Sequence, residues 1–329
     1  MVFATHAAHA PLLWAGVDLF FVLSGYLITG ILLRMKQRPA DGYFVPFYLR
    51  RARRILPPYF LFLICAVAIF HIRWLTCLWC VLFSANIGLA LGKVNDSVLT
   101  PLWSLAVEEQ FYLIWPLVVL MCDSRTLKRV ALSVMVLSPL LRAAATPFFH
   151  THFPIYFLSI FRADSLCAGA LIAIVQKEPS AWFVISRGTG VAAVTIGSAL
   201  CFAFLTTLPS FHTGSNSVLF NSLGYSLIAL FFFGVLIGAL NLKPGLALAV
   251  LAWPPLRSLG RISYSFYLWH WGIFLLLSER IHAPLLRALS AFTITTAIAA
   301  ASWHFMESPI LRSYSLSSGH RPAVKASAA

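Results

Sequence analysis

Apolar residues occur along this chain in repeated long runs, and short polar loops separate one run from the next. An α-helix needs roughly 20 apolar residues to cross a bilayer, where its backbone hydrogen bonds are all satisfied internally. Residues 1–10 form half of such a run, which looks like the end of a first helix whose beginning is missing. The pattern predicts about ten transmembrane helices. The full spans are residues 17–33, 55–70, 102–121, 130–145, 157–175, 189–207, 218–240, 262–278 and 289–306. We expect Glu307 to close the last of these helices at the cytoplasmic face.

One further apolar run, residues 74–91, does not fit a simple alternation across the membrane. Together with residues 55–70 and 102–121, it lies between two basic loops, residues 34–54 and 125–129. Loops rich in Lys and Arg stay in the cytoplasm, and three full crossings would put these two loops on opposite sides. We therefore predict a re-entrant segment, which is tolerated at membrane depth only where it lines a cavity or is covered by protein.

The composition excludes a soluble protein. The 329 residues are 60% hydrophobic and 10% charged, against roughly 25% charged in a soluble domain. The net charge of +14 would suggest nucleic acid in a soluble protein, but here it is typical of cytoplasmic loops, so no nucleic-acid partner is expected. We expect an all-α polytopic membrane protein with a membrane domain at residues 1–311, incomplete at its N-terminus. Residues 312–329 are expected to form a short, disordered cytoplasmic tail.

Two adjacent carboxylates, Glu108 and Glu109, lie near the start of an otherwise apolar run. An ionisable group inside a membrane helix is costly, which makes it a functional hypothesis by default. His6 lies in the N-terminal half span, and Asp18 and Ser24 follow on the next helix. A histidine oriented by a carboxylate can take a proton from an alcohol, because its pKa is near neutral. A buried imidazole that is satisfied by a backbone carbonyl is the simpler interpretation of a lone histidine.

Metal-ligating residues do not gather in the sequence. His6 and His9 are about one helical turn apart, but no third and fourth ligands accompany them. Cys77 and Cys80 have metal-like spacing without a second pair, so buried structural thiols are the better interpretation. No metal is expected.

Four arginines, Arg50, Arg51, Arg53 and Arg54, stand within five residues just before the apolar run at residues 55–70. One interpretation is a membrane anchor that contacts anionic lipid, at about 1 kcal/mol per charge. The other is a phosphate clamp, because arginine forks bind phosphate oxygens with two hydrogen bonds. The residues alone favour neither interpretation over the other.

Two further spans carry polar residues near or within their apolar runs. Arg162 and Asp164 are two residues apart, so they point in different directions on a helix and should pair with other elements. An interfacial arginine beside a helix-capping aspartate is the simplest interpretation of this pair. Tyr264 and His270 lie in an aromatic run, and an aromatic belt does not explain a histidine at that depth.

Taken together, these stretches resemble the membrane acyltransferase-3 family. Its members are O-acyltransferases that modify bacterial surface polysaccharides, peptidoglycan, nodulation factors and some macrolides. The matching stretches follow the order of the family and cover nearly the full length of the chain. They are residues 16–28, 51–57, 103–112, 162–164, 262–270 and 305–311.

The resemblance implies a ten-helix fold in the bacterial cytoplasmic membrane, with a cytoplasmic C-terminus. It also implies acyl-CoA, commonly acetyl-CoA, as the donor and a hydroxyl of a carbohydrate, glycolipid or glycoconjugate as the acceptor. The catalytic histidine of the family falls on His6 and its helix-mouth glutamate on Glu108. The arginines thought to hold the CoA phosphates fall on Arg51 and Arg54. The chain departs from the family pattern in one respect, because an arginine expected about three turns before His6 would precede Met1.

Two alternatives remain at this stage. A proton-coupled transporter or flippase could use Glu108 and His6 as a proton relay. Such a protein has no need of the arginine cluster, which favours the acyltransferase. An inactive, truncated paralogue is the second alternative, and only the missing half helix favours it.

Overall fold

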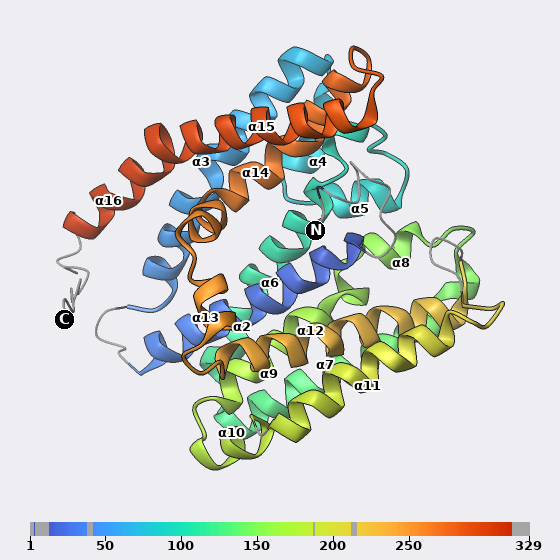
Figure 1. The fold of residues 1–329 in the computed structure, drawn as a ribbon, viewed down its shortest axis with the longest axis vertical. Coiled ribbons are helices and arrows are strands. Elements are labelled where there is room, and N and C mark those ends of the chain that lie inside the picture. The colour runs from blue at the N-terminus through green and yellow to red at the C-terminus, as the bar shows by residue number, and fades with distance from the viewer. Residues whose placement is uncertain (1–2, 4–12, 38–41, 187, 212–215, 318–329) are drawn as a thin grey trace. The chain divides into compact units, whose positions relative to one another are not determined.

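The computed structural model describes residues 3, 13–37, 42–186, 188–211 and 216–317, and every regular element in them is helical (Figure 1). The predicted all-α fold is confirmed. Among the described residues, seven helices are long and apolar enough to cross a membrane. They are Gly16–Lys36, Phe44–Phe70, Leu102–Met121, Ser124–Phe148, Gly188–Leu205, Phe220–Leu240 and Pro284–Ser313. The protein is therefore a multi-pass membrane protein, and the count of about ten crossings stays a prediction.

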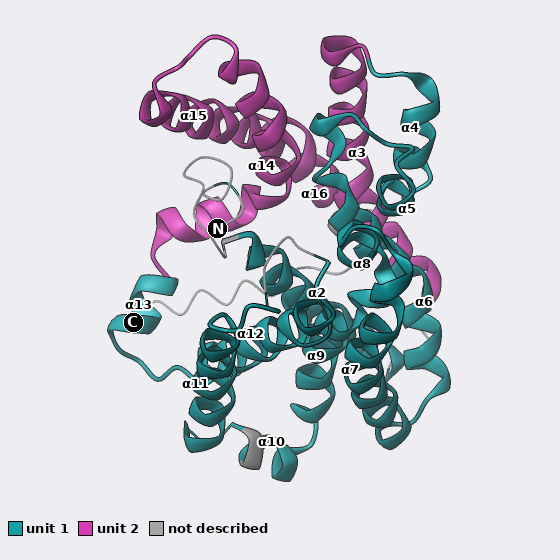
Figure 2. Cartoon of the chain, turned by 90° about the vertical axis from the view of Figure 1, so that its right-hand side faces the viewer, with its two compact units in different colours: residues 1–43, 72–251 teal, residues 44–71, 252–329 magenta. Residues whose placement is uncertain are grey.

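The chain forms two compact units, and each consists of two separate stretches of sequence (Figure 2). Unit 1 contains Met1–Tyr43 and Ile72–Leu251, and unit 2 contains Phe44–His71 and Ala252–Ala329. The predicted membrane domain at residues 1–311 does not anticipate this division.

Unit 1 is a helical bundle. In chain order it contains η1 (Leu13–Ala15), α2 (Gly16–Lys36), α4 (Trp74–Val81), α5 (Ala85–Ala90), η3 (Ser97–Leu99), α6 (Leu102–Met121), α7 (Ser124–Ala145), η4 (Thr146–Phe148), α8 (Phe153–Phe157), η5 (Ser159–Phe161), α9 (Ala163–Val175), α10 (Pro179–Ile185), α11 (Gly188–Leu205), η6 (Phe220–Gly224), α12 (Tyr225–Leu240) and α13 (Leu246–Leu251). Helix α9 is buried along its whole length and packs against α2, α7 and α12. Figure 1 shows these helices side by side, with α11 packed on α12.

The most extensive helix contact in unit 1 is between α2 and α9, and it depends on two glycines. A Cβ atom added at Gly25 would overlap the backbone carbonyl of Leu166, and one added at Gly169 would overlap that of Val22. Small residues let membrane helices approach closely without a hydrophobic driving force. This contact sets the position of the start of α9 against α2. Asp18 on α2 and Arg162 just before α9 lie in that region.

The segment at residues 74–91 does not form one spanning helix. It is divided into α4 and α5, and between them Phe83 adopts a left-handed conformation with φ of 50°. Asn86 on α5 and Gln110 on α6 join these elements, because Asn86 Oδ1 accepts from Gln110 Nε2 at 3.0 Å. Ser159 Oγ accepts from Asn86 Nδ2 at 3.0 Å and also donates to Gln110 Oε1. The broken helix agrees with the expected re-entrant segment, whose depth in a membrane stays a prediction.

Several predicted spans begin at the wrong residue. Helices α7 and α14 (Pro254–Ser278) begin six and eight residues before the predicted starts at 130 and 262, because their first turns are polar. The run at residues 157–175 is interrupted, so that only α9 is continuous. An apolar run locates the part of a helix that can lie in the membrane, but it does not locate the first residue of the helix.

Unit 2 contains α3 (Phe44–Phe70), α14, α15 (Pro284–Ser302), η7 (Trp303–Glu307) and α16 (Ser308–Ser317). Helix α3 packs against α14, η7 and α16, and α14 packs against α15. The π-helical turn η7 joins α15 to α16 without a break, although we expected Glu307 to close the last helix. Residues 312–317 are likewise helical rather than disordered, and residues 318–329 lie outside the described residues.

Candidate active site

Glu108 is a buried carboxylate on the packed face of α6. Its exposed fraction is 4%, whereas Glu109 is partly exposed. Ser104 and Tyr112, one turn before and after it, are also buried, as is Trp115. Residues four apart share a helix face, so the sequence itself directs Glu108 and these polar neighbours into the bundle.

The predicted catalytic histidine, His6, lies outside the described residues. The distance from His6 to Glu108 is therefore not defined, and their partnership stays a prediction. Ser24, predicted to line the same region, lies on α2 and is 2.9 Å from the hydroxyl of Tyr112, oxygen to oxygen. That contact links α2 to the face of α6 that carries Glu108.

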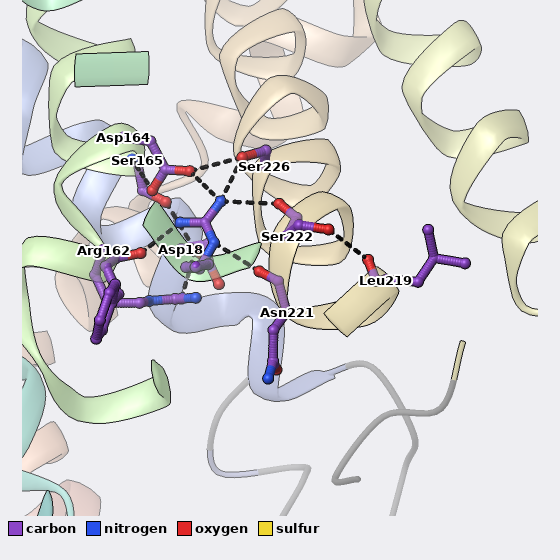
Figure 3. Close-up of polar contacts among 10 residues, drawn as sticks. Asp18, Arg162, Asp164, Ser165, Leu219, Asn221, Ser222 and Ser226 are labelled. Atoms are coloured by element: carbon purple, nitrogen blue, oxygen red, sulfur yellow. Dashed lines mark hydrogen bonds and ion pairs between the residues drawn. The ribbon is translucent and has the colours of Figure 1, made fainter. Parts of the chain in front are cut away.

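Asp18 and Arg162 form an ion pair in the interior of unit 1. Both side chains are fully buried, and Arg162 Nη2 lies 2.6 Å from Asp18 Oδ1. Ser165 Oγ donates to the same oxygen at 2.9 Å. Figure 3 shows these three side chains meeting where α2 faces the start of α9.

A second buried ion pair joins α7 to α9. Arg142 Nη2 lies 2.8 Å from Asp164 Oδ2, and Ser226 Oγ on α12 donates to the same carboxylate oxygen at 2.8 Å (Figure 3). The hydroxyl of Ser226 also accepts from Arg142 Nη2 at 2.5 Å. The remaining partners of Arg142 are three backbone carbonyls, those of Phe161, Asn221 and Ser222. Two of these carbonyls belong to the π-helical turn η6, a geometry that is common at functional sites.

The sequence prediction for Arg162 and Asp164 was half right. The two residues do point in different directions and pair with other elements, Arg162 with α2 and Asp164 with α7. The simplest interpretation, an interfacial arginine beside a capping aspartate, was wrong, because both residues are buried. Arg142 was missed, although an arginine inside an apolar run is itself a signal.

In unit 2, the arginine cluster lies on α3, and Arg54 is held by several groups. Arg54 Nη1 lies 3.4 Å from Glu307 Oε2, and its guanidinium carbon lies 4.9 Å from the centre of the Trp303 ring. Arg54 Nη2 also donates to the carbonyl of Arg261 at 3.2 Å. Arg50 is exposed, while Arg51 and Arg53 are partly exposed.

Glu307, which was expected at the end of the last helix, is a fully buried carboxylate. Ser265 Oγ donates to Glu307 Oε1 at 2.7 Å, and Ser302 Oγ donates to the same oxygen at 3.2 Å. The π-helical turn η7 contains Glu307. Arg54 therefore belongs to an ion pair with a buried carboxylate.

Tyr264 and His270, also predicted as site residues, both lie on α14 in unit 2. The Tyr264 hydroxyl donates to the carbonyl of Ile55 at 3.1 Å. His270 is buried, and its Nδ1 lies 2.6 Å from the carbonyl oxygen of Tyr267, which can only accept. The Tyr264 contact joins α14 to α3, whereas the His270 contact lies within α14. Neither contact by itself gives its residue a chemical role.

Two groups outside the membrane-length helices have altered acidity. Hydrogen bonds from Lys128 and, to a smaller degree, Ser124 lower the pKa of Glu178. Burial lowers the pKa of His152. Among the described residues, no three His, Cys, Asp or Glu side chains gather as a metal site, and the expectation of no metal stays a prediction.

Membrane-length helices around buried ion pairs define a multi-pass membrane protein with polar chemistry in its interior. The family described as "Acyltransferase domain" matches residues 2–304. The chain therefore belongs to this acyltransferase family, as its resemblance indicated.

Two relatives are named as O-acetyltransferases. The peptidoglycan O-acetyltransferase OatA of Listeria monocytogenes is 30% identical over 94% of this chain and 54% of its own length. The O-acetyltransferase OatA of Staphylococcus aureus is 29% identical over 90% of this chain and 52% of its own length. The chain thus spans about half the length of these relatives. No solved structure matches it.

Proposed function

We propose that this protein is a membrane O-acetyltransferase that moves an acetyl group from acetyl-CoA to a hydroxyl of a cell-wall glycan. The observation that carries the proposal is the family match over residues 2–304, together with relatives named for peptidoglycan O-acetylation. The acetyl-CoA donor, the cytoplasmic membrane and the cytoplasmic C-terminus belong to the proposal. So does the treatment of residues 1–311 as one catalytic domain.

The chemistry is a transfer from a thioester to an alcohol. The acceptor oxygen attacks the carbonyl carbon, a carbon–oxygen bond forms, and the carbon–sulfur bond breaks. His6 takes the proton of the hydroxyl and returns it to the leaving CoA thiolate, so that the base is regenerated. Glu108 stabilises the positive charge that His6 carries between these two proton transfers.

The arginine cluster supplies the donor site in this proposal. Arg50, Arg51 and Arg53 bind the CoA phosphates, because guanidinium groups match phosphate oxygens in charge and geometry. Arg54 anchors the arginine cluster of α3 to η7, because its guanidinium contacts Glu307 and Trp303 of that turn. If Arg54 left Glu307 to bind a phosphate, the buried Glu307 carboxylate would lose its ion-pair partner, which is costly.

The test is a transfer assay with the purified protein in lipid nanodiscs. We expect isotope-labelled acetyl-CoA and peptidoglycan fragments to give a base-labile, labelled ester on a sugar hydroxyl, detected by mass spectrometry. His6→Ala should abolish the ester, and Arg51→Ala with Arg53→Ala should raise the Michaelis constant for acetyl-CoA. In sealed proteoliposomes, movement of unmodified glycan across the membrane without any ester would instead support a transporter.

A further inference from the structure

We propose that the Asp18–Arg162 pair, with the aromatic rings around it, is the binding site for a neutral pyranose ring of the acceptor glycan. This inference rests on the proposed function and deepens it, because it assigns residues to the acceptor. Neither the family match nor the relatives' names assign a role to these side chains.

The first observation is that this ion pair has hydrogen-bonding atoms left over. Among the described residues, Arg162 Nε and Nη1 and Asp18 Oδ2 are buried and make no hydrogen bond. The pair is joined through Arg162 Nη2 and Asp18 Oδ1 alone. An unsatisfied buried donor or acceptor destabilises the folded protein, and native proteins have few of them. Such a group is expected to meet a ligand or a water.

The second observation is the charge at the pair. Asp18 already neutralises Arg162, and the nearby Asp164 is neutralised in turn by Arg142, so no net positive charge is left at the pair. A second anion would therefore gain little here. A hydroxyl group suits the vacant atoms better, because it can donate to Asp18 Oδ2 and accept from an Arg162 N–H at the same time.

The third observation is the aromatic surround. The guanidinium carbon of Arg162 lies 4.3 Å from the ring centre of Tyr225, 5.5 Å from that of Tyr156 and 5.9 Å from that of Phe21. Trp14 packs edge-on against Tyr156 and Tyr225, with ring centres 6.1 and 6.0 Å away. Sites for small neutral molecules combine aromatic walls with a few well-placed polar groups. The C–H face of a pyranose packs on such rings while its hydroxyls reach the ion pair.

Two rings of this cluster mark the side from which a sugar would enter. Trp14 and Tyr156 are partly exposed, whereas Asp18 and Arg162 are fully buried. The part-exposed rings form the rim of the proposed site, and the ion pair forms its base. Trp14 belongs to this rim, so a sugar bound there would change the surroundings of its indole.

The binding experiment uses the full chain in nanodiscs and N,N′,N″-triacetylchitotriose as the neutral glycan probe. We expect saturation-transfer NMR and tryptophan fluorescence to give a finite Kd that rises about tenfold or more in Arg162→Lys and in Asp18→Asn, because each loses a directed hydrogen bond to the sugar. Tyr156→Leu should also weaken binding without altering either charge. Arg129→Ala, an exposed arginine on α7, is the matched control and should keep the wild-type Kd.

The transfer assay separates this inference from the proposed function. Arg162→Lys should raise the Michaelis constant for the glycan and leave that for acetyl-CoA unchanged. If folded Arg162→Lys, Asp18→Asn and Tyr156→Leu all bind chitotriose as the wild type does, water alone meets the vacant atoms and the inference is wrong, even where transfer proceeds. Arg162-dependent glycan binding by a protein that transfers no acetyl would overturn the proposed function and leave the binding site in place.

Discussion

Arg142 and Arg162 are both fully buried in unit 1, and each pairs with one aspartate on a neighbouring helix. They differ in what surrounds them. Every nitrogen of Arg142 has a hydrogen-bond acceptor, from Asp164, Ser226 and backbone carbonyls. Arg162 has one hydrogen-bond acceptor in the described residues, Asp18, and its guanidinium carbon lies 4.3 Å from the centre of the Tyr225 ring.

This difference separates two uses of a buried charge. A fully satisfied network rigidifies a bundle and leaves no atom for a ligand. A partly satisfied pair retains unmet hydrogen bonds that a ligand can complete, at a cost to the stability of the empty protein. We infer that Arg142 holds α7, α9 and α12 together, whereas Arg162 serves binding.

The largest expected effect is from Arg142→Ala. Removal of one partner from a buried ion pair costs roughly 3–5 kcal/mol, because the other charge is left buried and unpaired. Thermal unfolding in nanodiscs should show a large fall in Tm, and the double variant Arg142→Met with Asp164→Leu should recover part of it. Arg129→Ala on the same helix should leave the Tm nearly unchanged. Equal Tm values for Arg142→Ala and Arg129→Ala would contradict the structural role.

The second prediction concerns the contact between α2 and α9, which brings Asp18 to Arg162 at the start of α9. Gly25→Ala would force α2 away from the Leu166 carbonyl of α9, at a cost of about 1–3 kcal/mol for overpacking. It should also impair acetyl transfer, since Asp18 on α2 then moves relative to Arg162. The matched control is Gly30→Ala, whose added Cβ meets only the end of the Arg34 side chain at 3.9 Å. A similar loss of Tm in both variants would show that the contact with α9 is not the cause.

The third prediction compares the two serines that bind the aspartates. Ser165→Ala removes the hydroxyl donor to Asp18, and Ser226→Ala removes the donor to Asp164. Each loss should cost about 1–2 kcal/mol, because the acceptor is charged. Ser165→Ala should additionally raise the Michaelis constant for the glycan, whereas Ser226→Ala should affect Tm alone. A raised Michaelis constant for the glycan in Ser226→Ala would show that the Arg142–Asp164 pair also takes part in binding, which contradicts the assignment to Asp18 and Arg162 alone.

The sequence predicts the fold well, because it depends on long apolar runs. The spans over α2, α6, α11 and α12 were located from hydrophobicity alone. The starts of α7 and α14 were not, since polar first turns carry no apolar signal. The break of residues 157–175 before α9 was missed for a related reason, because the interrupted stretch is as apolar as a helix.

The site was predicted less completely. Arg162 and Asp164 were found as charged residues of an apolar run, and the burial of Glu108 agrees with its choice over Glu109. Their partners could not be assigned, because pairs such as Asp18 and Arg162 are 144 residues apart in sequence. Glu307 was misplaced, since a π-helical turn that keeps the chain helical through a Ser-Pro step leaves no clear pattern.

The smallest effect is expected at an exposed ion pair that joins the same region as Arg142 and Asp164. Lys128 on α7 lies 2.6 Å from Glu178, which follows α9, and both side chains are about one-third exposed. Because exposed pairs contribute only about 0.2–1 kcal/mol, Glu178→Gln should lower the Tm slightly at neutral pH. Hydrogen bonds from Lys128 and Ser124 lower the pKa of Glu178 in the folded protein. The stabilisation is therefore complete above the pKa of an unfolded glutamate, about 4.3, and disappears as the pH falls through the folded value.

The measurement is the Tm difference between wild type and Glu178→Gln across a pH series, with Glu279→Gln as an exposed control at the end of α14. The difference should shrink toward zero as the pH is lowered from about 7 to about 3, because both proteins then lack the charge. Buried Arg142 and Asp164 join the same two helices, so loss of the exposed pair should leave acetyl transfer unchanged. If Glu178→Gln lowered the Tm as much as Arg142→Ala, burial would not be what distinguishes the two contacts between α7 and α9.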